Sequence, residues 1–195
     1  EGKNKGPLIK TTKKYLGSKW GGKYLRAPEI YWTILEKGKD KLNFLFDTIQ
    51  CDYGIKPGSV DFFYLNKETI SEWGIEKRFI KPLVNTTQNL KDYLIYPNEY
   101  LFYCHSSKKE LSGTGAFDYI KWGERQGFHE VTSVKGHRPY WYSLHGEAVD
   151  YLILRFWDRR FWTPIAQEEI YCSDNFFYGK ANLPDEKIIL NGLLN

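Results

Sequence analysis

Basic and aromatic side chains alternate in several stretches of the chain, and this combination suits contact with a polyanion. The stretches are SSKKELSGTG (106–115), SVKGHRPYWYSL (133–144) and LRFWDRRFW (154–162), and the turn-forming segment GIKPGS (54–59) carries a lysine at its tip. Lysine and arginine donate charge-assisted hydrogen bonds to phosphates, and loops on a rigid sheet are where such contacts commonly lie. The candidate DNA-binding set is therefore Lys56, Ser59, Lys108, Lys109, Lys135, His137, Arg138 and Arg155.

The same stretches also have a structural interpretation, in which the aromatic rings form the core and the cations are solvated. For Trp141, Phe156, Trp157 and Trp162 we favour the core, because aromatic side chains dominate core packing. Arg138 and Lys108 stay open between the two interpretations. The 54–59 segment is compatible with a DNA contact and equally with a tight connection between two elements.

Signals for catalysis, cofactors and metals are missing from the sequence. Residues 112–115 (SGTG) precede an expected helix but lack the Gly-Lys-Ser/Thr ending of a nucleotide-binding loop, which favours an ordinary loop and helix cap over a phosphate site. His129, His137 and His145 recur every eight residues, a spacing that matches no metal-binding helix, so we interpret them and His105 as structural or surface residues. We expect no catalytic residue, no bound cofactor and no metal on this chain.

Composition and charge indicate a fragment with a basic arm. The 195 residues include no methionine and begin at Glu1, which predicts a piece of a longer parent chain. Residues 1–41 hold 11 of the 28 Lys and Arg but only 4 of the 24 Asp and Glu, as in an arm that meets a polyanion or in a solvated linker. Cys51, Cys104 and Cys172 form no metal or disulfide pattern and predict buried thiols in a reducing compartment. With no apolar run long enough to span a bilayer, we expect a cytoplasmic protein without membrane partners.

The pattern of apolar residues predicts an α+β, strand-rich fold. A short helix begins at Pro28, with Ile30, Ile34 and Leu35 on its apolar face, and ends at Gly38. A second helix is expected over 116–128, with Phe117, Ile120 and Trp122 inward and Gly127 as its stop, and a third begins at Pro184. The expected strands lie within 44–54, 60–65, 76–84, 93–104, 138–144, 150–157, 159–165 and 168–179.

Several blocks, taken in order, resemble one family. They are KYLRAPEIYWTILEKGKDKL (23–42), IQCDYGIKPGSVDFFYL (49–65), EKRFIKPLV (76–84), YLFYCHSSKKEL (100–111), FDYIKWGERQG (117–127), RPYWYSL (138–144) and the stretch 161–179. Together they resemble the TaqI-like C-terminal specificity domain of adenine-specific DNA methyltransferases, whose relatives include fused type II restriction–modification enzymes. The adenine-gripping Asn-Pro-Pro-Tyr/Phe motif and the glycine-rich S-adenosylmethionine turn of that family are missing here.

The resemblance implies curved, mixed β-structure of the methylase specificity type, with a short N-terminal helix, an inserted helix and the start of a C-terminal one. It implies a basic arm and linker helix over 1–42 and a target recognition domain over 43–195. The implied function is sequence-specific recognition of double-stranded DNA. S-adenosylmethionine and methyl transfer would belong to the missing methyltransferase domain of the same parent, with or without a fused endonuclease.

Two other functions compete with DNA recognition. The aromatic content and the helix expected at the end of the chain also suit a protein-interaction module that docks a separate modification subunit. A self-contained nuclease is disfavoured, because the sequence offers no convincing set of carboxylates and lysine for metal-assisted cleavage.

Overall fold

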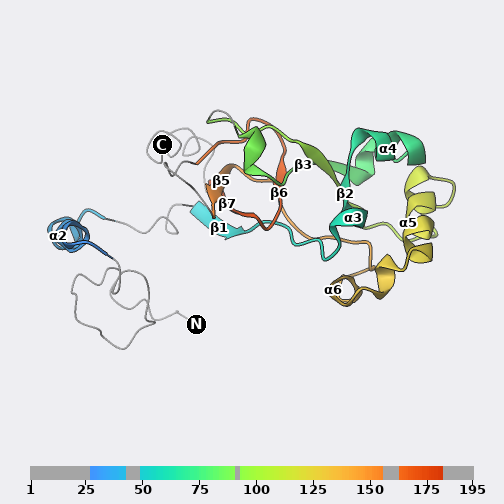
Figure 1. The fold of residues 1–195 in the computed structure, drawn as a ribbon, viewed down its shortest axis with the longest axis horizontal. Coiled ribbons are helices and arrows are strands. Elements are labelled where there is room, and N and C mark those ends of the chain that lie inside the picture. The colour runs from blue at the N-terminus through green and yellow to red at the C-terminus, as the bar shows by residue number, and fades with distance from the viewer. Residues whose placement is uncertain (1–26, 43–48, 91–92, 156–162, 182–195) are drawn as a thin grey trace. The chain divides into compact units, whose positions relative to one another are not determined.

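The computed structural model describes residues 27–42, 49–90, 93–155 and 163–181 (Figure 1). The chain divides into two compact units, residues 1–48 and 49–195. The expected boundary after residue 42 stays a prediction, because residues 43–48 lie outside the described part. The same holds for the basic arm and for the helix expected from Pro184.

In the first unit, the expected helix is confirmed as α2 (Glu29–Gly38), which begins directly after Pro28. The prediction of its apolar face was wrong for Ile30 and Ile34, whereas Leu35 is half-buried. Ile30 and Ile34 are exposed at 62% and 53%, whereas the side chain of Trp32 is buried. The indole of Trp32 has a larger apolar surface than either isoleucine and lies on another face of the helix, so its burial removes more apolar surface from water.

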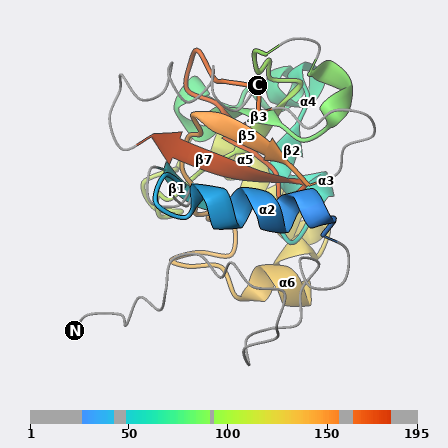
Figure 2. The same cartoon turned by 90° about the vertical axis from the view of Figure 1, so that its left-hand side faces the viewer.

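The second unit contains two sheets. The first is antiparallel, with β7 (Phe176–Ala181) between β1 (Ile49–Tyr53) and β5 (Tyr151–Leu154), as Figure 2 shows. The second has the order β2 (Tyr64–Leu65), β4 (Glu99–Phe102), β3 (Ile80–Val84), β6 (Tyr171–Cys172), and only its β3–β6 pair is parallel. These strands lie within the stretches that the sequence predicts, except that β7 continues past residue 179 to Ala181, and the mixed α+β class is confirmed.

One expected strand begins as a helix. Residues 60–65 form α3 (Val60–Phe63) followed by the two-residue β2. Phe62 and Phe63 are both fully buried in the same cluster. A strand would turn these neighbouring rings to opposite faces of a sheet, whereas a helical turn lets both enter one core.

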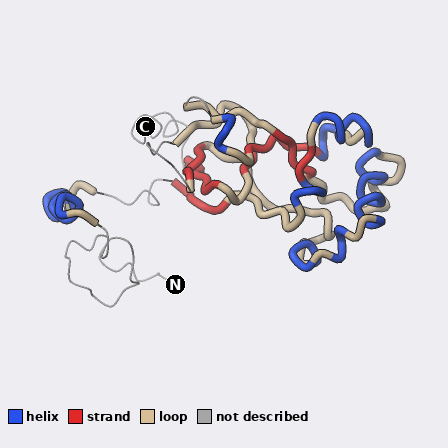
Figure 3. The backbone as a smooth tube through the Cα atoms, viewed as in Figure 1, coloured by secondary structure: helices blue, strands red, loops and turns tan. Residues whose placement is uncertain are grey.

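Helices gather around the second sheet in this unit (Figure 3). Helix α4 (Lys67–Trp73) was not predicted, although its limits follow known rules: the Asn66 side chain accepts a hydrogen bond from the Thr69 amide (2.8 Å), and Gly74 ends the helix at φ 60°. The predicted inserted helix is α5 (Gly115–Arg125), with Gly127 at φ 82° after it. Ile120 is buried as expected, Phe117 and Trp122 are half-buried, and Tyr119 is a buried residue not foreseen.

The strand expected over 138–144 is absent, and turns take its place. Tyr142 Oη donates to the carbonyl of Ser106 (2.9 Å), and Ser143 Oγ donates to the carbonyl of Cys104 (3.0 Å). Side chains rather than a strand ladder therefore fix this segment against the end of β4.

The remaining short elements are η2 (Lys77–Phe79), η3 (Thr87–Asn89), η4 (Phe128–Glu130) and α6 (Thr132–Lys135). Within the described ranges, no helix is long and apolar enough to cross a bilayer.

Candidate nucleic-acid interface

The segment from Gly54 to Ser59 is fixed at both ends. At its start, the amide of Gly54 donates to the Phe176 carbonyl (3.1 Å) and the amide of Ile55 donates to the Cys172 carbonyl (2.8 Å). Near its end, the carbonyl of Gly58, at φ 73°, accepts a hydrogen bond from Ser133 Oγ (2.7 Å). Lys56 is exposed between the two anchors, and Ser59 is half-buried. The lysine is thus presented from a rigid base.

A second basic segment meets the first one at Ser133, in α6. Lys135 and Arg138 are exposed, and Arg138 Nη1 donates to the carbonyls of Lys135 (3.1 Å) and His137 (2.8 Å). The carbonyls position the guanidinium at the end of α6, and its remaining N–H donors have no partner in the described part of the chain. The Ser133–Gly58 bond places these two cations in the same neighbourhood as Lys56 and Ser59.

The histidines in and near this segment bond to the main chain. His137 Nδ1 bonds to the Trp141 carbonyl (3.0 Å), His145 Nε2 to the Arg138 carbonyl (2.7 Å) and His105 Nε2 to the Leu144 carbonyl (2.7 Å). Burial lowers the pKa of His137, which favours the neutral ring. These contacts support the structural interpretation of the three side chains. His137 in particular positions its loop rather than adding a positive charge to it.

Lys108 and Lys109 differ in their surroundings. Lys108 forms an ion pair with Glu124, and the same carboxylate oxygen accepts a hydrogen bond from Trp141 Nε1 (3.1 Å). Lys109 is exposed, and no carboxylate partner is found for it among the described residues. Glu124 of α5 therefore holds both Lys108 and Trp141 of the 138–144 segment, whereas Lys109 keeps its charge free for a ligand. Trp141 itself is half-buried against the core.

The Glu124 carboxylate gives a testable pH dependence. Burial alone would raise the pKa of Glu124, but the hydrogen bonds from Lys108 and Trp141 outweigh burial and lower it. A lowered folded-state pKa stabilises the protein above the unfolded-state pKa, and this contribution disappears as the pH falls through the folded-state value. We expect Glu124→Gln to lose less stability than wild type between about pH 5 and pH 3. Urea unfolding at each pH measures this.

The control for this pH experiment is Glu72→Gln, an exposed carboxylate on α4. The control should follow the wild-type dependence. Identical pH dependence in Glu124→Gln and wild type would contradict the assigned role of this carboxylate.

Arg155 lies in a polar groove of about 420 Å³ at the ends of β3, β5 and β6. The groove is lined by Asn85, Thr86, Thr87, Arg155, Asn175 and Phe176. Arg155 Nη1 donates to the Asp174 carbonyl (2.6 Å), and Asn175 Nδ2 donates to the Asn85 carbonyl (2.9 Å). Guanidinium, amide and hydroxyl groups are the ones that proteins use to read base edges. Of these residues only the arginine was predicted from the sequence, because NTT (85–87) and DN (174–175) are typical of ordinary turns.

The groove and the first basic segment share a backbone connection. The amide of Asp174 donates to the carbonyl of Ile55 (3.0 Å), and the Asp174 carbonyl accepts from Arg155. Ile55 directly precedes Lys56. Two hydrogen bonds therefore connect the Arg155 groove to Ile55, the backbone continues from Ile55 to Gly58, and a third hydrogen bond connects Gly58 to Ser133 in α6. We call residues 54–59, 133–138, 155 and 174–175 together the basic ridge.

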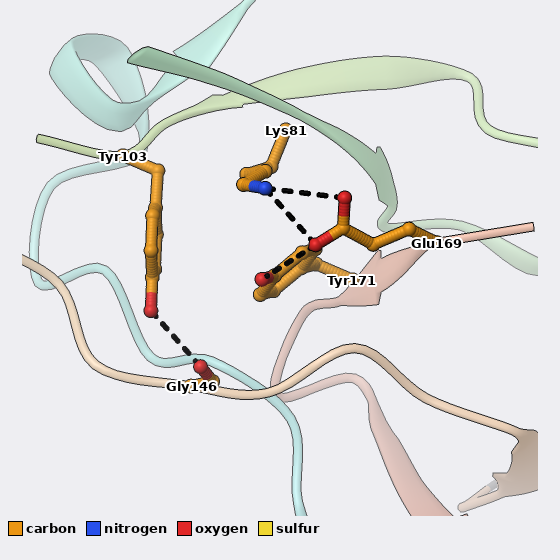
Figure 4. A network of polar contacts seen from close by, with 5 residues as sticks. All are labelled: Lys81, Tyr103, Gly146, Glu169 and Tyr171. Carbon is orange, nitrogen blue, oxygen red and sulfur yellow. Dashed lines mark hydrogen bonds and ion pairs between the residues drawn. The ribbon is translucent and has the colours of Figure 1, made fainter. Parts of the chain in front are cut away.

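A separate polar network lies on the second sheet (Figure 4). Lys81 Nζ donates to both carboxylate oxygens of Glu169 (2.9 and 3.1 Å), Tyr171 Oη donates to Glu169 (3.3 Å), and Tyr103 Oη donates to the Gly146 carbonyl (3.0 Å). The hydrogen bond from Lys81 lowers the pKa of Glu169, and burial raises the pKa of Tyr171 to about 12. The cation and the phenols are thus engaged with groups of the chain itself, which makes this network structural.

The first turn of α5 holds an anion from its own chain. Thr114 Oγ1 accepts from the Phe117 amide (3.1 Å), as expected of a helix cap. The Glu76 carboxylate accepts from the amides of Gly115 (3.1 Å) and Ala116 (3.3 Å), which are the groups that a phosphate would need. The cap predicted for residues 112–115 is confirmed, and Glu76 occupies the place of an external anion.

The three cysteines are free thiols that differ in burial. Cys104 and Cys172 are buried as predicted, but Cys51 is half-exposed on β1, which corrects the expectation of three buried thiols. Burial raises the pKa of Cys172 to about 12, so that thiol is protonated.

Across the described ranges, no three His, Cys, Asp or Glu side chains come together as a metal site. The aromatic residues expected in the core at 156, 157 and 162 lie outside those ranges, as do the arginines at 159 and 160.

In comparisons with known proteins, no family model matches the chain, and no curated protein matches it significantly.

Proposed function

We propose that this chain recognises a specific sequence in double-stranded DNA through the basic ridge. The observation that carries the proposal is the hydrogen bond from Ser133 Oγ to the Gly58 carbonyl, which brings the two basic segments together across 75 positions of sequence. Lys56, Lys135 and Arg138 then form a local group of exposed cations on packed backbone. Neutralising phosphates with such cations releases counterions and supplies most of the non-specific affinity for DNA.

The groove beside Arg155 supplies the second requirement, which is sequence discrimination. Cations hold a protein in register on the duplex, and side-chain amides and arginines distinguish the bases. Asn85 and Asn175 come from different turns, and the hydrogen bond of 2.9 Å between them holds the two turns together. A groove held in this way presents fixed donors, which lowers the entropic cost of binding.

The resemblance of the sequence blocks extends the proposal to a whole enzyme. In this proposal the chain is the target recognition domain of an adenine-specific DNA methyltransferase of a restriction–modification system, with the fold type of that family. The methyltransferase domain of the parent would bind S-adenosylmethionine and the flipped adenine. Extruding a base costs a few kcal/mol, and contacts made by a recognition domain can offset that cost. The chain itself then performs no catalysis.

Removing two cations of the basic ridge tests the electrostatic part of the proposal. We expect Lys135→Ala/Arg138→Ala to weaken duplex binding about 10-fold to 100-fold, because each substitution removes a charge-assisted hydrogen bond to the DNA. The slope of log K against log salt should become shallower by about one for each phosphate that the variant no longer neutralises. Fluorescence anisotropy of a labelled duplex at several salt concentrations measures both quantities.

Lys121→Ala is the matched control for the double variant. Lys121 is exposed on α5, outside the basic ridge, and pairs with Asp118 (2.9 Å). Its removal should leave the affinity and the slope nearly unchanged. Equal effects of the double variant and the control would remove residues 133–138 from the interface.

Asn175 tests the groove separately from the ridge cations. We expect Asn175→Ala to reduce discrimination between the preferred duplex and a single-base variant by about 1–3 kcal/mol while leaving the salt slope unchanged. The reason is that an amide contributes hydrogen bonds but no charge. Competition binding with single-base variants of the preferred duplex measures the change, and Gln126→Ala, an exposed amide after α5, is the control. Unchanged discrimination would exclude Asn175 from base reading.

A further inference from the structure

An apolar groove lies on the second sheet, away from the basic ridge. Its floor is made by Ile80 and Pro82 of β3, Tyr100 of β4 and Ile70 of α4, and its volume is about 450 Å³. Pro82 pairs with Tyr100 across the two strands, and Ile80 precedes Pro82 by two positions. Because alternate residues of a strand face the same side of a sheet, these side chains form one continuous surface.

The groove exists because the helices cover this side of the sheet only in part. Phe102 shares the face with Tyr100 and is fully buried, with its ring 5.3 Å from that of Tyr119 in α5. Tyr100 and Pro82 are half-buried, since α4 ends after seven residues and contributes only Ile70 and its neighbours to the groove. Half-covered apolar surface in a concave site is typical of a binding site.

The rim of the groove is basic. Lys67 and Lys77 line it, both are exposed, and neither has a carboxylate partner among the described residues. Four other lysines of this unit, Lys81, Lys108, Lys121 and Lys180, each pair with a glutamate or an aspartate, whereas Lys56, Lys109 and Lys135 also have no such partner among the described residues. The lining itself contains no acidic side chain. An apolar floor with two unpaired cations at its rim is complementary to an apolar ligand that carries negative charges.

We propose that this groove docks a segment of a partner protein in which apolar side chains alternate with carboxylates. The volume admits a few side chains of an extended or helical segment, and Lys67 and Lys77 would pair with the flanking acids. A duplex carries its negative charge on a backbone of sugars and phosphates and has no flexible apolar side chains that could fill the floor, so the site is distinct from the basic ridge. This inference does not depend on the proposed DNA recognition.

A pair of designed peptides tests the groove. The probe is a fluorescein-labelled peptide of about 12 residues built from leucine and glutamate in amphipathic order, and its counterpart has lysine in place of every glutamate. We expect the full chain to bind the leucine–glutamate peptide and to prefer it over the counterpart by about tenfold or more. In Lys67→Glu/Lys77→Glu this preference should reverse. Lys109→Glu/Lys135→Glu, which changes the same charge elsewhere, should bind the probe as the wild type does.

A second variant and a second ligand separate the alternatives. Ile70→Ser should weaken binding of the probe while circular dichroism and thermal unfolding report an intact fold. Duplex DNA should bind Lys67→Glu/Lys77→Glu as it binds wild type. The proposal is overturned if the wild type binds both peptides equally, if it binds neither, or if the groove variants lose duplex binding along with the probe.

Discussion

Phe62→Ala is expected to lower the free energy of unfolding by about 3–5 kcal/mol, because it removes the centre of the main core. The Phe62 side chain is fully buried. Its ring lies between 4.7 and 5.6 Å from the rings of Phe63, Phe102, Tyr119, Phe128 and Trp141. These partners come from α3, β4, α5, η4 and the 138–144 segment, so the cavity would weaken the packing among these five parts of the chain.

Urea denaturation followed by tryptophan fluorescence measures this decrease. The control is Val60→Ala in the same helix, where the side chain is 55% exposed and little apolar surface is removed from the core. The control should cost about 0.5 kcal/mol or less. A Phe62→Ala variant no less stable than Val60→Ala would contradict the aromatic core described above.

Gly54→Ala has the second largest expected effect, a destabilisation of about 3 kcal/mol. A methyl group at this position would meet the carbonyl oxygen of Ser173 at 2.0 Å and that of Cys172 at 2.8 Å. Neither carbonyl can withdraw easily, since the Ser173 amide is bonded to the Val84 carbonyl (3.0 Å) and the Cys172 carbonyl accepts from Ile55 (2.8 Å). The added carbon would push the 54–59 segment away from β6.

Gly136→Ala is the control for this prediction, because a methyl group there meets nothing within 4 Å and the backbone is right-handed, at φ −79°. Thermal unfolding of both variants compares their stabilities, and the control should match wild type or exceed it slightly. If Gly54→Ala were as stable as Gly136→Ala, the close packing of the 54–59 segment against β6 would be wrong. The variant should also weaken duplex binding, because it displaces Lys56.

Strands with alternating apolar residues and helices with a start or stop signal were predictable from the sequence. The alternating stretches predicted β1, β5 and β7. Pro28 marked the start of α2, and Gly127 marked the end of α5. Prediction failed where tertiary packing overrides local pattern. Phe62 and Phe63 look like strand residues but share one core, and residues 138–144 use their hydroxyl groups to bond distant carbonyls.

The candidate site was predictable only as separate loops. Residue type identified Lys56, Lys135 and Arg138, but nothing local indicates that Gly58 lies against Ser133. The amides beside Arg155 were missed for a related reason. Asn85 follows β3 and Asn175 follows β6, and these two strands pair in parallel although they lie far apart in the sequence. Long-range strand pairing therefore creates the groove, and no short pattern of residues indicates it.

The most direct test of duplex recognition is a selection from random DNA. The chain, alone and within the longer methyltransferase that we propose as its parent, would be mixed with duplexes containing a randomised stretch, and bound DNA would be sequenced after repeated rounds at two salt concentrations. We predict that one short consensus containing adenine is enriched at both concentrations and that Lys135→Ala/Arg138→Ala reduces its recovery. Recovery of duplexes with no shared sequence, from either form of the protein, would contradict sequence-specific recognition by the basic ridge.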